Sequence, residues 1–219
     1  MEKYDSSIET NKHIIKVREY LDVIYKKIEE RKDIKVNDIN TKIEELTLID
    51  LISMLYVGNA IPSYDDLFKS INKNSTNYLL ISGFTKEEIM QIYLDELIDR
   101  GINHDKSKLE TPEKEEFDIW TPKLRYSTYG SDEYKFFLKE LKKALSHHYR
   151  YNRHHPEHFG NGIYGMTIMD LIEMLCDWKA ASERHDDGDI FKSIEINQKR
   201  FGYSDSMRKV LVNTIKKNF

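Results

Sequence analysis

Histidines are concentrated in one short part of this sequence. The chain has 219 residues and eight histidines, and five of the eight lie between positions 147 and 158. Imidazole is a common ligand of transition metals, and it is also the side chain whose charge changes near neutral pH. The crowding therefore predicts either a metal site or a pH-sensitive surface cluster, and the surrounding residues must decide between the two.

The stretch "NHDKSKL" places His104 directly before Asp105. Adjacent residues on a regular helix point about 100° apart, so these two converge on one ion only at a helix end or a sharp turn. A nitrogen and an oxygen ligand together suit Fe, Mn, Zn or Co. Lys108 follows at a position from which it can hold an anion near the cation. The alternative is a histidine at a helix C-terminus beside a solvated aspartate.

The stretch "SHHYRYNRHHPEHF" contains two histidine pairs, His147 with His148 and His154 with His155. His148 lies on the apolar stripe of its expected helix, and a single histidine there is commonly a core residue. The second pair precedes Pro156, which breaks helices and favours an extended residue before it. Three imidazoles are thus expected near one helix end, with a surface cluster as the alternative.

The stretch "EMLCDWKAASER" places Asp177 inside an apolar helix. A buried carboxylate needs a partner or a metal. Glu173 lies one turn earlier, and Arg184 almost two turns later on the same face. An ion pair between Asp177 and an arginine or lysine is the alternative to a metal.

In their order, these motifs resemble the HD-domain metalloprotein superfamily. "HDKSK" resembles its His-Asp-Ile-Gly-Lys-type signature, "HHPEHFGNGIYG" the His-His-Glu…Asp-Gly…Gly-Tyr stretch of the HD-GYP branch, and "CDWKAASER" the helix with the last metal aspartate. The chain also resembles a small uncharacterised family from phages and low-GC bacteria that shares "HDKSKL", "HHPEH" and "DLIEMLCDWKAAS". The resemblance covers about residues 100–184, and the helix around His13 more weakly.

The resemblance implies an all-α, HD-like bundle with one or two divalent transition metals (Mn, Fe, Co or Zn) at its centre. It implies a minimal site of four ligands: His13, His104, Asp105 and Asp177. A second metal position would use Asp105 as a bridge, with one residue from each histidine pair: His147 or His148, and His154 or His155.

Three departures from the superfamily pattern limit what is carried over. His13 precedes His104 by 91 residues, which is farther than is usual. Ser107 stands where the signature has glycine, and Pro156 and His158 differ from the HD-GYP stretch. Specificity for cyclic dinucleotides is therefore not implied.

These ligands favour a metal-dependent phosphohydrolase that acts on a nucleotide or another small phosphorylated compound through activated water. The residues expected to do catalytic work beside the metal are Lys108, Glu157, Glu173 and Arg184. Further cations that could surround a phosphate are Arg150, Arg153, Lys199 and Arg200. Two alternatives stay open: a mixed-valent di-iron oxygenase of the HD type, and a non-catalytic helical binding protein of phage origin.

The expected elements that position these residues are almost all helical, within one domain over residues 1–219. Apolar periodicity and capping signals predict helices over 14–28, 47–57, 63–71, 85–101, 111–117, 131–148, 167–184 and 204–218. The helix over 85–101 begins with a Thr85–Glu88 capping box and is expected to end at Gly101. Residues 32–84 are expected to be a helical insertion, and 78–82 is the only candidate strand.

Composition excludes several classes of protein. A net charge of −4 and a sequence pI of about 6.1 argue against a dedicated nucleic-acid surface. No apolar run approaches the roughly 18–20 residues that cross a bilayer, and "MEKYDSSIETNKH" is unlike a signal peptide. With a single cysteine, we expect a cytoplasmic protein without disulfides or a membrane partner.

Overall fold

The computed structural model describes residues 4–35, 42–57, 61–76, 83–128, 131–184 and 188–219, which contain α-helices and no strand. The all-α prediction is confirmed; the expected strand at 78–82 lies outside the described residues. None of the described helices is both long enough and apolar enough to cross a membrane. The α-helices are α1 (Ser7–Glu29), α2 (Leu48–Tyr56), α3 (Asp66–Thr76), α4 (Lys86–Asn103), α5 (Glu113–Tyr126), α6 (Asp132–Tyr151), α7 (Ile168–Ser182), α8 (Ile190–Phe201) and α9 (Asp205–Asn218).

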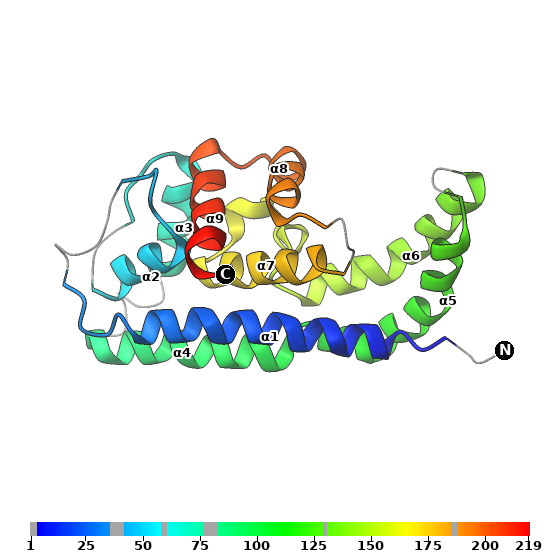
Figure 1. The fold of residues 1–219 in the computed structure, drawn as a ribbon, viewed down its shortest axis with the longest axis horizontal. Helices are drawn as coiled ribbons and strands as arrows, with labels where there is room; N and C mark the ends of the chain where they lie inside the picture. The colour runs from blue at the N-terminus through cyan, green and yellow to red at the C-terminus, as the bar shows by residue number, and fades with distance from the viewer. Residues whose placement is uncertain (1–3, 36–41, 58–60, 77–82, 129–130, 185–187) are drawn as a thin grey trace.

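Helices α1, α4 and α7 form the framework of the molecule (Figure 1). α1 and α4 lie side by side and run in opposite directions, and α7 packs on α1. The stripe of α1, which includes Val17, Leu21, Ile24 and Ile28, is buried. Every residue of α7 from Ile168 to Cys176 is buried, as expected for a helix at the centre of the molecule. One hydrophobic core therefore contains residues from the first helix, α1, and from α7 in the C-terminal third of the chain.

The segment 32–84, expected to be an insertion, packs into this same core. Every residue of α2 is buried, and α2 contacts α1, α4, α7 and α9. Thr47 and Asp50 form a capping box at its start, and Arg31 reaches Asp50 at 2.6 Å. The segment thus helps to hold α7 in place, while none of its described residues belongs to a cluster of potential metal ligands.

Several predicted helix boundaries are wrong: the helix expected over 63–71 runs from Asp66 to Thr76, and the one expected over 131–148 ends at Tyr151. Two further differences have tertiary reasons. The Thr85–Glu88 capping box is confirmed, but α4 continues past Gly101 to Asn103. Gly101 instead lies against α1, where an added Cβ would stand 3.4 Å from Arg18 and 3.6 Å from Leu21. α5 begins at Glu113, without a threonine cap, and runs past Pro122 to Tyr126. It lies along α6, and that packing outweighs the local proline signal.

Helix α8 was not among the predicted helices. Its N-cap is Asp189, which accepts hydrogen bonds from two backbone amides, and it ends at Gly202 in the left-handed conformation (φ 68°). Only Ile190 and Ile194 are buried, so its apolar stripe is short. α8 packs on α7 and α9.

Helices α5 and α6 form an arm that projects from the body (Figure 1). Near its outer end Trp120 packs with Phe136 and Phe137. The predicted stripe of α6 is buried only toward its C-terminal end, at Leu141 and His148, whereas Leu138 is 45% exposed. The outer half of α6 lies beyond the core, and its inner end reaches the histidines.

Candidate metal centre

The chain turns sharply after α4, and this turn aims two adjacent side chains at one place. His104 is the C-cap of α4, and Asp105 has a left-handed backbone (φ 54°), a conformation that aspartate tolerates better than most residues. The side chains converge, with 3.8 Å between His104 Nε2 and Asp105 Oδ2, and both residues are buried. A 3-10 turn then returns Lys108, whose Nζ donates to Asp105 Oδ2 at 2.6 Å.

Four side chains from three elements form what we name the first donor group: His13, His104, Asp105 and Asp177. His13 of α1 and Asp177 of α7 are 164 residues apart, yet His13 Nε2 lies 2.8 Å from Asp177 Oδ1. His13 Nε2 is also 3.7 Å from Asp105 Oδ2, and His104 Nε2 is 3.7 Å from Asp177 Oδ1. These potential ligand atoms lie within 4.8 Å of one another, close enough to share one ion.

A second donor group shares Asp105 with the first and adds His148, His154 and His155. His148 is on the last turn of α6, and the other two histidines follow in the loop. Asp105 Oδ1 lies 3.2 Å from His148 Nε2 and 3.5 Å from His154 Nε2. His148 Nε2 and His155 Nε2 are 2.9 Å apart. Asp105 therefore turns one oxygen toward each group.

Two buried glutamates orient three of these imidazoles from behind. Glu173 lies 2.8 Å from His104 Nδ1 and 3.1 Å from His154 Nδ1. Glu113, at the start of α5, lies 2.9 Å from His148 Nδ1. An Nδ1–H donated to a carboxylate leaves the Nε2 lone pair free to face a metal, and such carboxylate–histidine pairs are typical supports of metal ligands.

The residue that stands in place of the signature glycine joins this support. Ser107 Oγ accepts from Asn152 Nδ2 at 2.8 Å and lies 3.3 Å from His148 Nδ1. Asn152 also donates to the His148 carbonyl at 2.8 Å. The serine thus ties the turn after His104 to the end of α6.

Buried ligand atoms without hydrogen-bond partners test whether a metal ion fits the two donor groups. His104 Nε2, His154 Nε2 and Asp105 Oδ1 are buried and have no hydrogen-bond partner among the described residues. Such atoms are rare in folded proteins because burying them unpaired is costly. His104 Nε2 lies near Asp177 in the first donor group, and His154 Nε2 lies 3.5 Å from Asp105 Oδ1 in the second. A divalent cation in each group would satisfy these atoms. The mixture of imidazole and carboxylate suits Mn, Fe, Co or Zn.

The environment of the centre shifts the pKa values of its titratable groups in opposite directions. Burial alone would raise the pKa of Asp105, but Lys108 and His104 hold it well below its ordinary value. Burial opposes a charge on His154, yet Glu173 and Asp105 outweigh it and raise the pKa of His154 to about 10. Burial, with His154 beside it, lowers the pKa of His155 to about 2. Without a cation, one imidazole is therefore charged and its neighbour neutral.

The remaining predicted site residues occupy different places. His147 is outside both donor groups, because its Nδ1 lies 2.7 Å from Glu113 Oε1. Glu173 lies behind the imidazoles rather than beside a substrate, where it also accepts from Arg100 at 2.7 Å. Arg184 is exposed, and its charge contributes to lowering the pKa of His13. Asp177 pairs with His13 and His104, and no described arginine or lysine forms the alternative ion pair with it.

Sequence reasoning missed Glu113 and the charged network behind Glu173. Glu113 is fully buried, but its distance of 35 residues from His148 hides the pairing in the sequence. Arg100 and Arg153 both donate to Asp170, at 2.8 and 2.9 Å. A guanidinium in an amphipathic helix such as α4 carries no sign of a buried partner on α7, so only the packing of the two helices reveals it.

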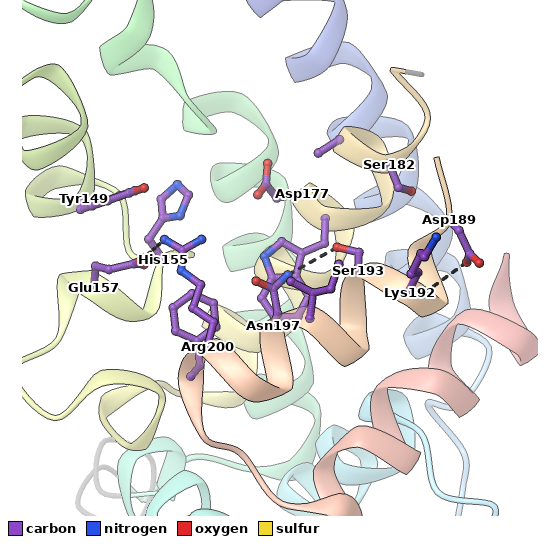
Figure 2. Close-up of a pocket in the computed structure, with 14 residues that line it drawn as sticks. Tyr149, His155, Glu157, Asp177, Ser182, Asp189, Lys192, Ser193, Asn197 and Arg200 are labelled. Atoms are coloured by element: carbon purple, nitrogen blue, oxygen red, sulfur yellow. Dashed lines mark hydrogen bonds and ion pairs between the residues drawn. The ribbon is translucent and has the colours of Figure 1, made fainter. Parts of the chain in front are cut away.

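A cleft of about 460 Å³ opens beside the donor groups, between α7 and α8 (Figure 2). We name it the α8 cleft. His155 and Asp177, one from each donor group, lie at its wall, and Glu157 lies close by with Arg200 at 2.5 Å. Its lining residues are Tyr149, His155, Glu157, Asp177, Trp178, Ala181, Ser182, Asp189, Lys192, Ser193, Ile196, Asn197, Arg200 and Phe201. The volume lies in the range of small-molecule sites.

Comparison with known proteins gives a family but no function. A model described as "Family of unknown function (DUF5662)" matches residues 2–217, which is nearly the whole chain. No curated protein and no solved structure matches the chain significantly.

Proposed function

Since the chain belongs to the DUF5662 family, whose function is unknown, we propose its activity from the site itself: it is a metal-dependent phosphohydrolase of the HD type, acting on a nucleotide or another small phosphorylated compound. The observation that carries this proposal is the pair of donor groups that share buried Asp105 and border a cleft. The order of the motifs in the sequence supports it independently.

Seven side chains would hold the cations. The first donor group would hold one ion, and the second donor group the other, with one oxygen of Asp105 toward each; His147 is not included. Two divalent ions at such a centre supply a lowered pKa for water and positive charge for the oxygens of a phosphoryl group.

The remaining residues would position the substrate and move protons. Lys108, held at Asp105, adds one positive charge at the edge of the centre. Arg200 lies at the wall of the α8 cleft that contains His155, where its guanidinium can bind phosphate oxygens. In the reaction, the oxygen of water bonds to phosphorus as the P–O ester bond breaks. Glu157 accepts the water proton on its carboxylate and returns it to the leaving oxygen, so that an alcohol and inorganic phosphate are released.

Metal content provides the first test of this proposal. Native protein, purified without chelator, is expected to contain Mn, Fe, Co or Zn by elemental analysis. Asp105→Ala should lose both ions and Asp177→Ala only the ion of the first donor group, and phosphate release from glycerol 2-phosphate and AMP should fall by more than about 100-fold in both variants. Asp66→Ala, on an exposed aspartate of α3, is the matched control and should keep metal and activity.

Two results would overturn the proposal. Unchanged metal content in Asp105→Ala would show that the donor groups do not bind the ions. Full metal loading without phosphate release from any monoester, diester or polyphosphate in a broad panel would leave the site a metal centre with another task.

A second candidate function, the mixed-valent di-iron oxygenase, is favoured by one observation: three of the four residues in the second donor group are histidines. Such a nitrogen-rich position suits iron as well as zinc. The two candidates separate cleanly. Iron content with oxygen consumption would support the oxygenase, whereas phosphate release under anaerobic conditions with Mn or Co would support the hydrolase.

A further inference from the structure

The α8 cleft offers no surplus of positive charge. It is lined by three carboxylates, Glu157, Asp177 and Asp189, and by two cations, Lys192 and Arg200. Arg200 is paired with Glu157 at 2.5 Å. Lys192 makes no ion pair with any described residue, but it lies at the same end of the cleft as Asp189 (Figure 2). The lining can therefore lie beside a single phosphate group, but it would repel the further phosphates of a di- or triphosphate because its net charge is negative.

Part of the cleft lining is apolar and aromatic. Trp178 of α7 stacks with Phe201 at an interplanar angle of 7°, and both line the cleft. Ile196 of α8 also lines it and is 61% exposed. Exposed apolar surface in a concave site gains free energy when an apolar ligand covers it. Trp178 itself is only 8% exposed, so a planar, uncharged group would cover mainly Ile196 beside the aromatic pair.

One amide lies beside this apolar surface. Asn197 Nδ2 makes only a long hydrogen bond of 3.4 Å, to Ser193 Oγ, and its carbonyl oxygen has no hydrogen-bond partner among the residues described. Figure 2 shows both residues in the middle of the cleft, between the end with Arg200 and the end with Lys192. A free amide can pair with a polar edge of a ring while its apolar neighbours contact the ring face.

We infer that the α8 cleft selects an ester of one phosphate group whose organic part is planar and uncharged, with the phosphate near Asp177 and His155 and the planar part along Trp178, Ile196 and Asn197. Nucleoside monophosphates and aryl phosphates share this chemistry. The inference rests on the proposed phosphohydrolase function for the reaction, but the binding that it describes can be measured without turnover.

Charge at the centre agrees with this selection. If both positions hold divalent ions, Asp105 and Asp177 neutralise two of the four positive charges and Lys108 adds one, so the centre is positive enough to attract one phosphate dianion. Additional phosphates would need cations that the cleft wall does not supply. Hydrolysis then involves water attack on phosphorus, cleavage of the ester P–O bond and protonation of the leaving oxygen, without an oxidant or reductant.

The experiment combines binding with turnover on the full chain. The chain has two tryptophans, Trp120 and Trp178. In the Trp120→Phe variant, indole fluorescence comes from Trp178 alone and reports binding in the cleft. Titration with AMP, GMP, CMP, UMP and phenyl phosphate in the presence of zinc should quench Trp178 saturably, whereas ATP and glucose 6-phosphate should bind at least about ten-fold more weakly. The nucleotide and aryl arms distinguish the two sources of the planar group. The same order is expected for kcat/KM.

Variants of α8 then test which residues select. Ile196→Ser and Asn197→Ala should each weaken binding of the preferred monophosphate by about ten-fold, an effect typical of losing a few methylenes or one hydrogen bond in a site. Glu195→Ala, an exposed residue of α8 that is outside the cleft lining, is the matched control and should match the parent protein.

The outcomes separate the inference from the proposed function. Turnover of ATP or glycerol 2-phosphate as efficient as that of any planar monophosphate would overturn the inference and keep the phosphohydrolase. Saturable quenching without phosphate release from any substrate would support the cleft assignment and count against the hydrolase. Absence of quenching by every planar monophosphate would overturn the inference, whatever the enzyme hydrolyses.

Discussion

The two donor groups share Asp105 but differ in chemistry and in the elements that hold them. The first contains two histidines and two aspartates, from α1, the end of α4 and α7. The second contains three histidines and one aspartate, and its histidines come from the last turn of α6 and the loop after it. The first is therefore richer in charge and is fixed by helices of the core, whereas the second is richer in nitrogen.

Their supports differ in the same way. His104 of the first group rests on Glu173, which lies inside α7. His148 of the second group rests on Glu113, which belongs to the projecting arm. His154 depends on Glu173 as well, so Glu173 serves both groups and Glu113 only one. The first donor group therefore depends on the core helices, whereas the second also depends on how the arm packs against the core.

The largest effect is expected when a ligand unique to one group is removed. Asp177→Ala should empty only the first position, and His148→Ala only the second, so each variant should retain about one ion in a zinc titration. Phosphate release should fall by more than about 100-fold in both, since even losing an outer support costs about 10–100-fold. Retention of both ions in either variant would contradict the division into two groups.

A smaller effect is expected from the supporting glutamates. Glu113→Gln should weaken zinc binding at the second position alone, and Glu173→Gln at both, by about 10–100-fold per position. Isothermal titration calorimetry measures the two steps. Glu115→Gln, a neighbouring glutamate of α5 outside the centre, is the control. Equal effects of Glu113→Gln on both steps would show that the arm supports the whole centre.

The metal-free protein should reveal the second group by its pH dependence. The pKa of His155 is about 2 in the folded chain, against an ordinary 6.5, so below pH 6.5 the unfolded chain binds more protons. The free energy of unfolding should then fall on acidification, by at most about 1.4 kcal/mol per pH unit for this one group. The pKa of His154 is raised to about 10, so its contribution is present below pH 6.5 and is lost as the pH rises toward 10.

Urea denaturation of chelator-treated protein between pH 5 and 9 measures this profile. His155→Asn should flatten the acid side and leave the alkaline side unchanged. An acid limb as steep in His155→Asn as in the parent protein would assign the dependence to other groups, such as His13, whose pKa burial also lowers.

The smallest effect is expected at the outer end of the arm. Phe136 is 52% exposed, and Phe136→Ala should change the free energy of unfolding by no more than about 0.5–1 kcal/mol, with both zinc steps intact. Thermal denaturation and the same calorimetry provide the measurement. A loss of zinc from the second position would mean that the arm supports the centre along its whole length rather than through Glu113.

Much of the fold follows from local patterns in the sequence. The Thr85–Glu88 capping box predicted the start of α4, and apolar residues predicted α1 and α7. Such signals can be found in the sequence because they act within one or two helical turns. α8 escaped prediction because only Ile190 and Ile194 are buried on it. The helix predicted over 111–117 was too short, because α5 continues through Pro122 to Tyr126 where it packs along α6.

The donor residues were expected from the crowded histidines, the His104–Asp105 pair and the resemblance of the motif order to the HD-domain superfamily, and His13 entered the set through that resemblance. The sequence by itself determined which residue types are available: five of the eight histidines crowded near Pro156, and the His104–Asp105 pair. It left open which histidine of each pair faces the centre.

Only the tertiary structure decided that question. It turned His148 inward and His147 toward Glu113, bent the backbone at Asp105 so that each carboxylate oxygen serves one group, and brought His13 to Asp177 across 164 residues. The physical reason is that ligand direction depends on helix ends and on contacts between helices distant in the sequence, which no local pattern of residues encodes.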